Sequence, residues 1–192
     1  MSESSSIPML SNDAKENPLE AMTSLMVHQF GPDWKIFMDA AGRQTTPETI
    51  TPRLREFSAK VAGTEPIRIP VQPLAPALRC HMNVEDYCQQ HPGAESVYGW
   101  IIWENAKFAE AEFHAVIRKD GKLVCITTMP DGEKELVFFE DKERKPKIEA
   151  FGDKDHIVHT FFNVHVDTAK VHPRVGMLAP GHLDPVSIPA IP

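Results

Sequence analysis

The stretch from Ala111 to Thr128, AEFHAVIRKDGKLVCITT, contains two short runs of apolar and β-branched residues on either side of Asp120-Gly121. Such runs are typical of β-strands, and an Asp-Gly pair between them favours a two-residue hairpin turn. The sequence therefore predicts an antiparallel pair of strands in which residue 117 faces residue 124. In this register Cys125 lies on the same side of the pair as His114 and close to it.

Further short runs of the same kind occur before and after this pair. They extend over residues 97–103, 135–139 and 157–166. Asp131-Gly132 predicts a second hairpin, which would join the strand before it to the strand at 135–139. We expect all of these segments to belong to one antiparallel sheet.

The N-terminal third has a different pattern, in which apolar residues recur every three to four positions. Pro18 can open a first helix. Thr51 is a plausible N-cap with Pro52 at the first helical position, and Gly63 is a plausible stop. We therefore expect helices within residues 18–63.

Residues 64–79 contain too many prolines for a helix or a central strand. We expect them to form an extended connector that leads to Cys80. The polar run after Cys80 is compatible with a helix that stops at His91. Cys80 is therefore expected at, or just before, a helix N-terminus.

These patterns predict an α+β fold, in which N-terminal helices and a helix carrying Cys80 pack on an antiparallel β-sheet. A length of 192 residues suits one domain, which we assign to 18–170. Residues 1–17 are rich in Ser, Asn and Glu, so we expect a mobile tail there. Residues 171–192 are rich in proline and are expected to form a C-terminal tail.

The composition excludes several classes of partner. The 20 Lys and Arg against 27 Asp and Glu give a formal net charge of -7, the wrong sign for broad contact with nucleic acid or an anionic membrane. We find neither a secretion signal nor an apolar run of membrane-spanning length. The three cysteines suit a reducing compartment, so we expect a cytoplasmic protein of unknown oligomeric state.

Cys80 and His114 could form a catalytic pair. A helix N-terminus supplies partial positive charge and a nearby imidazole takes the thiol proton, so a cysteine in this position can become a nucleophilic thiolate. His114 lies on a predicted strand that would pack against the Cys80 helix. The alternative is that Cys80 is a small buried hydrophobe and His114 a structural, half-buried histidine.

The motifs YGWIIWEN, EAEFHAV and DGKLV-x-IT, with a cysteine closely followed by Asn-Val, resemble a group of small uncharacterised bacterial and phage proteins. The order of Cys80, His114 and the segment from Leu123 also resembles the transglutaminase-like branch of the papain-like thiol hydrolases. The resemblance covers roughly residues 79–130. It implies a transglutaminase-like core, in which a helix carrying Cys packs against an antiparallel sheet carrying His and Asp, and thiol hydrolase activity.

Cys125 is the main departure from this pattern, because the resembling proteins have Asp at that position. The Asp orients the imidazole, although a Cys-His dyad can act without it. We therefore include Cys125 as a candidate third member of the catalytic site. Asn163 is an alternative orienting residue, and Gln72 is a candidate for binding the oxyanion.

Three further residues are candidates for contact with a substrate. Trp100 and Trp103 could line a cleft next to the catalytic pair, and Asn83 follows Cys80 on the same helix. The alternative for the aromatic residues is that they belong to the core.

Metal binding is a further alternative. One possible set of ligands combines the three cysteines with His114, and another contains His156, His159 and His165. The cysteines do not form the close pairs that are usual in zinc sites, and positions three apart on a strand face opposite sides. We expect no metal and no cofactor.

Two functions follow from the sequence. The first is a small thiol-dependent hydrolase or acyltransferase, in which Cys80 attacks an amide or ester carbonyl and His114 transfers the proton. The alternative is a catalytically silent relative that binds a protein or peptide in its cleft. The replacement of Asp by Cys125 motivates this alternative.

Overall fold

The computed structural model describes residues 42–150, 157–178 and 184–191. The chain divides into two compact units, Met1–Gly42 and Arg43–Pro192, and the description below concerns the second. The predicted tail at 1–17 and the predicted helices before residue 42 lie outside the described residues.

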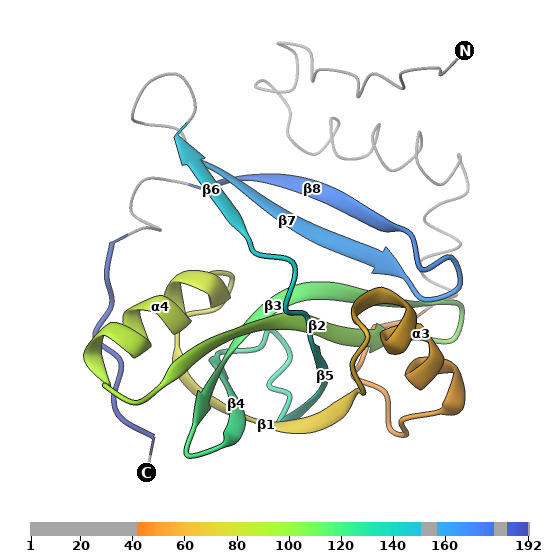
Figure 1. The fold of residues 1–192 in the computed structure, drawn as a ribbon, viewed down its shortest axis with the longest axis horizontal. Helices are drawn as coiled ribbons and strands as arrows, with labels where there is room; N and C mark the ends of the chain where they lie inside the picture. Colours follow the sequence, from red (N-terminus) through yellow and green to blue (C-terminus); the bar gives the residue numbers. More distant parts are fainter. Residues whose placement is uncertain (1–41, 151–156, 179–183, 192) are drawn as a thin grey trace. The chain divides into compact units, whose positions relative to one another are not determined.

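Five strands of this unit close into a β-barrel (Figure 1). Neighbouring strands follow the order β2-β5-β1-β4-β3, and β3 pairs with β2 to complete the ring. The β1–β4 pair is parallel, while the other pairs of the ring are antiparallel. The five strands are β1 (Ile67–Ala75), β2 (Glu95–Glu104), β3 (Ala109–Lys119), β4 (Lys122–Thr127) and β5 (Glu135–Glu140).

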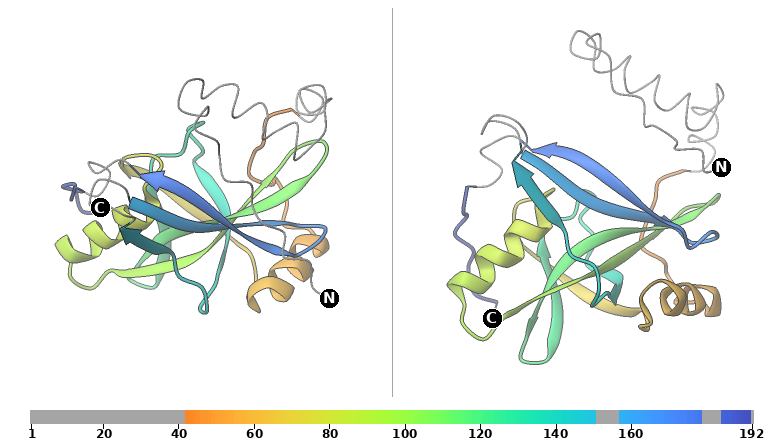
Figure 2. Two further views of the ribbon diagram at one scale, coloured as in Figure 1. Left: turned by 90° about the horizontal axis from the view of Figure 1, so that it is seen from above. Right: turned by 45° about the horizontal axis from the view of Figure 1, so that its top comes forward.

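Three more strands extend the sheet beyond the barrel. Strand β7 pairs with β3 and is flanked by β6 and β8, as two further views show (Figure 2). Their bounds are β6 (Lys147–Ala150), β7 (Ile157–His165) and β8 (Val171–Leu178). Part of the predicted C-terminal tail is therefore a strand of the sheet.

The α+β prediction is wrong. Strands make up most of the regular secondary structure, and the described residues contain only two short helices, α3 (Pro52–Ala62) and α4 (Cys80–Gln90). The papain-like arrangement of a cysteine helix on an open antiparallel sheet is replaced by a closed barrel. The main reason is that residues 67–75, predicted as a connector, form the strand that closes the ring.

Proline is tolerated in β1 because the pairing of this strand with β4 is interrupted. The two strands pair only at Val71↔Cys125 and Ala75↔Thr127, with an irregularity between these positions. The Val71 N–H bonds Lys134 O at 2.8 Å on the β5 side, so alternation directs the backbone of Pro70 toward β4. The missing N–H of Pro70 therefore falls on the edge of β1 that does not pair with β5, at a position before the pairing with β4 begins.

One of the two predicted hairpins is confirmed. Asp120 and Gly121 have φ values of 51° and 74°, as a type I′ turn requires, and Ile117 faces Val124. The hairpin predicted at Asp131-Gly132 is wrong. The chain does turn there, but β5 pairs with β1 and β2 rather than with β4.

Both described helices begin where the sequence predicts. Thr51 caps α3 by accepting a hydrogen bond from the Leu54 N–H, and Gly63 ends the helix in a left-handed conformation. Cys80 is the first residue of α4, and His91 follows its last turn.

The core consists of three clusters, one inside the barrel and two on the outer face of the sheet. The barrel interior contains residues from all five barrel strands, among them Ile69, Val116, Cys125 and Phe138. A second cluster lies between α3 and the sheet and includes Trp100. The third lies under α4. Since side chains alternate along a strand, Ala115 and Ile117 of β3 face α4 while Val116 faces the interior.

The segment 184–191 lies along α4 (Figure 1). Gln90 binds its backbone twice, donating to Val186 O at 2.7 Å and accepting from the Ile188 N–H at 3.0 Å. The Asp86 carboxylate accepts from the Val186 N–H at 3.1 Å. Ile188 is buried among the residues under α4, so this part of the predicted tail also belongs to the folded core.

Candidate functional site

Cys80 is placed at the edge of β3 by the packing of α4. Val84 and Tyr87 of α4 are fully buried against the outer face of β3 and β4. Asn83, one turn after Cys80, donates to Pro76 O at 2.7 Å and to Thr127 Oγ1 at 3.0 Å. The N-terminus of α4 is thereby tied both to β4 and to the chain that follows β1.

A gap in the sheet receives the Cys80 sulfur. Strand β3 pairs with β7 as far as Glu112 and with β4 only from Ile117 onward. The Ala115 N–H, which lies between these points, donates to the Cys80 sulfur, as does the His81 N–H. Cys80 thus occupies an interval along one edge of β3 that neither β4 nor β7 covers, while β2 pairs with the other edge throughout.

The Cys80 thiol is not activated in this position. Burial raises the pKa of the thiol to about 12, and the charge of Glu112 acts in the same direction. The two backbone N–H donors lower the pKa by less than burial raises it. At neutral pH the sulfur is therefore a protonated thiol.

His114 and Cys125 lie together on the interior side of the barrel. The His114 Nε2 atom is 3.4 Å from the Cys125 sulfur, which also lies 3.7 Å from Thr127 O. Burial lowers the pKa of His114 to about 4 and raises the pKa of Cys125 to about 12. Both groups are therefore neutral at pH 7, and the contact is not an ion pair.

The three predicted catalytic residues are neighbours, but they do not form a nucleophile-base pair. Cys80 packs with the cluster under α4, while His114 and Cys125 face the barrel interior. In the described part of the chain no hydrogen bond joins Cys80 to His114. The imidazole is engaged instead by the thiol at the position where the resembling proteins have Asp.

The predicted substrate-binding residues are mostly structural. Trp100 is fully buried, and its Nε1–H donates to Asp141 at 2.9 Å. Asn83 is also fully buried, and its Oδ1 lacks a partner among the described residues. Trp103 is partly exposed and donates to Glu112 at 3.3 Å, so it is the one of the three that a ligand could reach.

No hydrogen bond in the described residues connects Asn163, the alternative orienting residue, or Gln72, the candidate for oxyanion binding, to Cys80 or His114. Asn163 lies opposite Glu112 in the β3–β7 pair, and its buried Oδ1 has no partner in the described ranges. Gln72 lines a separate pocket on another part of the barrel. The described residues contain no group of three His, Cys, Asp or Glu side chains placed to hold a metal ion.

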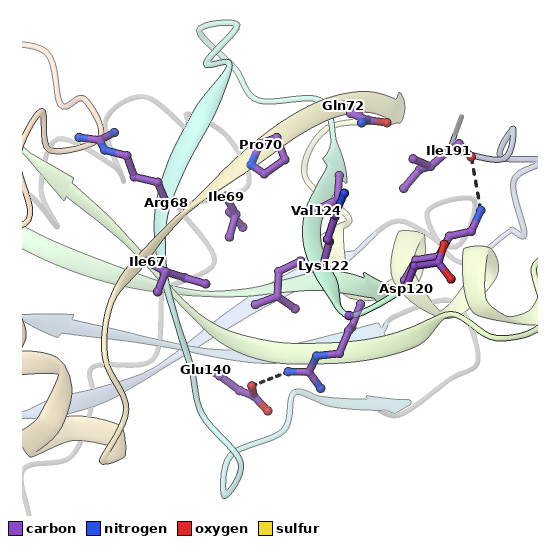
Figure 3. Close-up of a pocket in the computed structure, with 14 residues that line it drawn as sticks. Ile67, Arg68, Ile69, Pro70, Gln72, Asp120, Lys122, Val124, Glu140 and Ile191 are labelled. Atoms are coloured by element: carbon purple, nitrogen blue, oxygen red, sulfur yellow. Dashed lines mark hydrogen bonds and ion pairs between the residues drawn. The ribbon is translucent and has the colours of Figure 1, made fainter.

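That separate pocket was not predicted from the sequence. It has a volume of about 870 Å³ and lies between β1 and the β3–β4 hairpin (Figure 3). It exists because β1 and β4 diverge before their first paired residues, Val71 and Cys125. The run Arg118-Lys119-Asp120-Gly121-Lys122 carries its basic residues around the hairpin turn, and this was the signal available in the sequence.

The pocket is basic at its rim and apolar along its walls. Arg68 and three basic residues of the hairpin line it, against the two carboxylates of Asp120 and Glu140. Arg118 is held by Glu140 at 2.6 Å, and Lys119 Nζ donates to Ile191 O at 3.3 Å. The apolar walls are formed by Ile67, Ile69, Pro70, Leu123, Val124 and Ile191.

The chain matches no protein-family model, no curated protein and no solved structure in the three comparisons made. None of the described helices has the length and apolar character needed to cross a membrane.

Proposed function

We propose that this chain is a non-catalytic module that binds a protein or peptide, and that its thiol cluster is catalytically silent. The neutral, buried contact between His114 and Cys125 is the observation that carries the proposal. A cysteine nucleophile needs a thiolate or an adjacent base, and here the imidazole contacts a second thiol instead.

The pKa values support the same proposal. Reactive cysteines have lowered pKa values, whereas burial raises the pKa of Cys80 to about 12. A base with a pKa near 7 is best suited to proton transfer, whereas the pKa of His114 is lowered to about 4. Burial thus moves the nucleophile and the base away from the values that catalysis requires.

The pocket between β1 and the β3–β4 hairpin is the binding site in this proposal. Pockets that combine apolar walls with a few polar groups are the usual sites of ligand recognition. Cys80, His114 and Cys125 do not line this pocket. The three free cysteines suit a reducing compartment, and we propose a cytoplasmic location.

Alkylation of the native protein tests the silence of the thiols. We would treat it with iodoacetamide at pH 7.5 and follow each cysteine by mass spectrometry. Cys80 and Cys125 should react at least tenfold more slowly than a model cysteine peptide, because burial raises the pKa of both thiols. A Cys80 rate above that of the peptide would overturn the proposal.

A thiol hydrolase or acyltransferase is the second candidate. It is favoured by one specific observation, the donation of the Ala115 and His81 N–H groups to the Cys80 sulfur, since such donors stabilise a thiolate. In this mechanism the Cys80 sulfur attacks the carbonyl carbon, His114 takes the thiol proton, and the leaving group departs with that proton to leave a thioester.

Substitution of Cys125 separates the two candidates. Cys125→Asp restores the carboxylate of the resembling proteins, and Cys125→Ser is the matched neutral control. If Cys80 and His114 act as a nucleophile-base pair, Cys80 should react faster in the Asp variant than in the native and Ser forms, because a charge-assisted hydrogen bond stabilises the imidazolium. If the thiol cluster is silent, Cys80 should react no faster in the Asp variant, because no hydrogen bond joins it to His114 in the described residues and a negative charge at position 125 raises its pKa. Hydrolysis of an activated ester by the native protein that is lost in Cys80→Ala would favour the enzyme.

A further inference from the structure

We infer that the pocket between β1 and β4 binds an extended peptide carrying acidic and aliphatic side chains, which adds to the sheet as a strand. This inference rests on the proposed function, since it names the ligand class of the same pocket. Three features carry it: unpaired strand edges, a surplus of basic side chains, and an exposed aliphatic wall.

The first feature is that both strands have an open edge facing the pocket. Residues 67–70 of β1 pair with β5, and residues 122–124 of β4 pair with β3, but these two segments do not pair with each other. All of them line the pocket. Unpaired strand edges are the elements to which extended peptides add.

The register identifies the backbone groups that are available. Since Val71 N–H bonds toward β5, the backbone groups of Arg68 are directed away from β5 and into the gap. On the other side, the two-residue hairpin pairs Lys119 with Lys122, so the next residue, Leu123, directs its N–H and C=O away from β3. Arg68 and Leu123 thus offer donors and acceptors to a peptide main chain.

The second feature is charge. The pocket is lined by four basic residues and two acidic ones in a chain whose formal net charge is -7. Arg118 is already neutralised by Glu140, while Lys122 has no ion pair or side-chain hydrogen bond within the described residues. The Arg68 guanidinium donates to Pro47 O at 2.7 Å and to Glu48 O, and it forms a long ion pair with Glu135 at 3.9 Å. Lys122 therefore supplies the unpaired charge for a peptide carboxylate, and Arg68 adds a second positive charge that is only weakly paired.

The third feature is the apolar wall. Ile67 is 45% exposed and is one of two large hydrophobic residues that are exposed in the described part of the chain. It lines the pocket together with Leu123. Because side chains alternate along a strand, a peptide with alternating acidic and aliphatic residues can place carboxylates toward the basic rim and aliphatic groups on this wall.

The protein already binds one main-chain carbonyl group at this rim. Lys119 Nζ donates to the carbonyl oxygen of Ile191, a residue of the segment that runs along α4 (Figure 3). This contact recognises a main-chain group rather than a side chain. An added strand would bond its main chain to the backbone groups of Arg68 and Leu123, and Lys119 shows that a basic side chain of this rim can bind a main-chain carbonyl as well.

Binding of synthetic peptides to the full chain tests the inference. The probe is a fluorescein-labelled peptide of sequence EVEVEVE, and its control is KVKVKVK with the same label. The acidic peptide should bind at least tenfold more tightly at low salt, and its affinity should fall as salt is added. Equal affinity for the two peptides, or no binding of the acidic one at millimolar concentration, would overturn the inference.

Charge reversal locates the site. Lys122→Glu should weaken binding of the acidic peptide at least tenfold, whereas Lys107→Glu, the same change at an exposed residue outside the pocket, should leave it unchanged. Equal effects of the two substitutions would show that the peptide does not bind in the pocket. Unchanged circular dichroism would confirm that both variants are folded.

A proline-containing peptide tests strand addition itself. Replacing the central valine by proline removes a main-chain donor without changing the charge. Affinity should fall at least tenfold if the peptide pairs with the strand edges. Unchanged affinity would overturn strand addition and leave only attraction between charges. Failure of any peptide test leaves the alkylation test of the silent thiols unaffected, so the two proposals fail separately.

Discussion

The thiol cluster and the β1–β4 pocket are built from the same hairpin, yet they offer opposite chemistry. Strands β3 and β4 carry His114 and Cys125 in the barrel wall, and Lys119 and Lys122 at the turn. In the wall, burial holds the thiols and the imidazole neutral. At the turn the basic side chains line an open pocket. The surroundings, rather than the residue type, decide which region can act on a ligand.

The difference concerns pairing as well as burial. In the thiol region, the uncovered interval of β3 is filled by α4, whose Cys80 accepts the Ala115 N–H. At the pocket, the gap between β1 and β4 is left open. If this contrast is correct, substitutions in the closed regions should mainly change stability, and those at the pocket should mainly change binding.

The largest expected effect belongs to Asp141, which is almost completely buried. It accepts from Trp100 Nε1 at 2.9 Å and from Arg144 Nη1 at 2.6 Å. Asp141→Ala removes the acceptor of these two side chains and of the backbone N–H groups of Glu143 and Arg144, and should lower the free energy of unfolding by about 3 kcal/mol. Urea denaturation at pH 7 measures this loss.

Asp141→Asn is the control, because it retains an acceptor for Trp100 and should cost less. Burial alone would raise the pKa of Asp141, but the bonds from Trp100, Arg144 and the backbone outweigh it and lower the pKa. The stabilisation is therefore complete above the ordinary carboxyl pKa and is lost as pH falls through the lower, folded-state value. A stability that does not change at acid pH would contradict this.

An effect of similar size concerns His114 and has a different pH range. Its pKa is lowered from 6.5 to about 4, so between these values the unfolded chain binds more protons than the folded chain. Stability should be complete above pH 6.5 and should fall by about 3 kcal/mol as pH decreases toward 4. His114→Gln should remove this slope, which urea denaturation across the range would measure. An unchanged slope in the variant would assign it to other groups.

A smaller effect is expected at Ile188, which links the two regions through the segment along α4. Ile188 is 2% exposed, and Ile188→Ala should lower the free energy of unfolding by about 2 kcal/mol. Val186→Ala, at a less buried position of the same segment, is the matched control and should cost less. Equal losses would indicate that the backbone bonds to Asp86 and Gln90, rather than apolar burial, hold the segment.

The smallest effect on stability is expected at Lys122. Lys122→Gln should change the free energy of unfolding by less than about 0.5 kcal/mol, since the side chain is exposed and makes no ion pair with a described residue. The same variant should bind the acidic peptide more weakly. A large loss of stability would place Lys122 in the folding core and remove the contrast between the regions.

Local signals in the sequence predicted local structure well. The start of α3 followed from the Thr51 hydroxyl and from Pro52, and its end from Gly63. The register of β3 and β4 followed from Asp120-Gly121. These signals depend on neighbouring residues and on the backbone freedom of glycine. The position of Cys80 at the start of α4 was predicted on the same basis.

The closure of the barrel could not be predicted in this way. Pro70 argued against a central strand, and only the absence of a partner on that edge makes proline acceptable there. The wrong hairpin at Asp131-Gly132 has the same origin, since a turn signal does not say which strands pair. Gly99 shows the limit again. An added Cβ would lie 2.2 Å from Phe139 O, and this close approach arises from the pairing of β2 with β5, which are distant in the sequence.

The candidate site was predicted in part. The neighbourhood of His114 and Cys125 followed from the hairpin register, and the 3.4 Å contact agrees with it. Their pKa values could not be predicted, because these depend on burial by strands distant in the sequence. Trp100 was a candidate for the wall of a cleft, with the core as the alternative, and its complete burial and its hydrogen bond to Asp141 agree with the core.

The pairing of β1 with β4 and β5 also has a consequence for the order of folding. The β2–β3 and β3–β4 hairpins join neighbours in the chain and can form early and independently. Strand β1 is made before them but finds both of its partners only after β5 has been synthesised. During synthesis on the ribosome, β1 therefore stays unpaired, with its apolar residues exposed, until β5 has been made. Ring closure should be the slow, late step of folding.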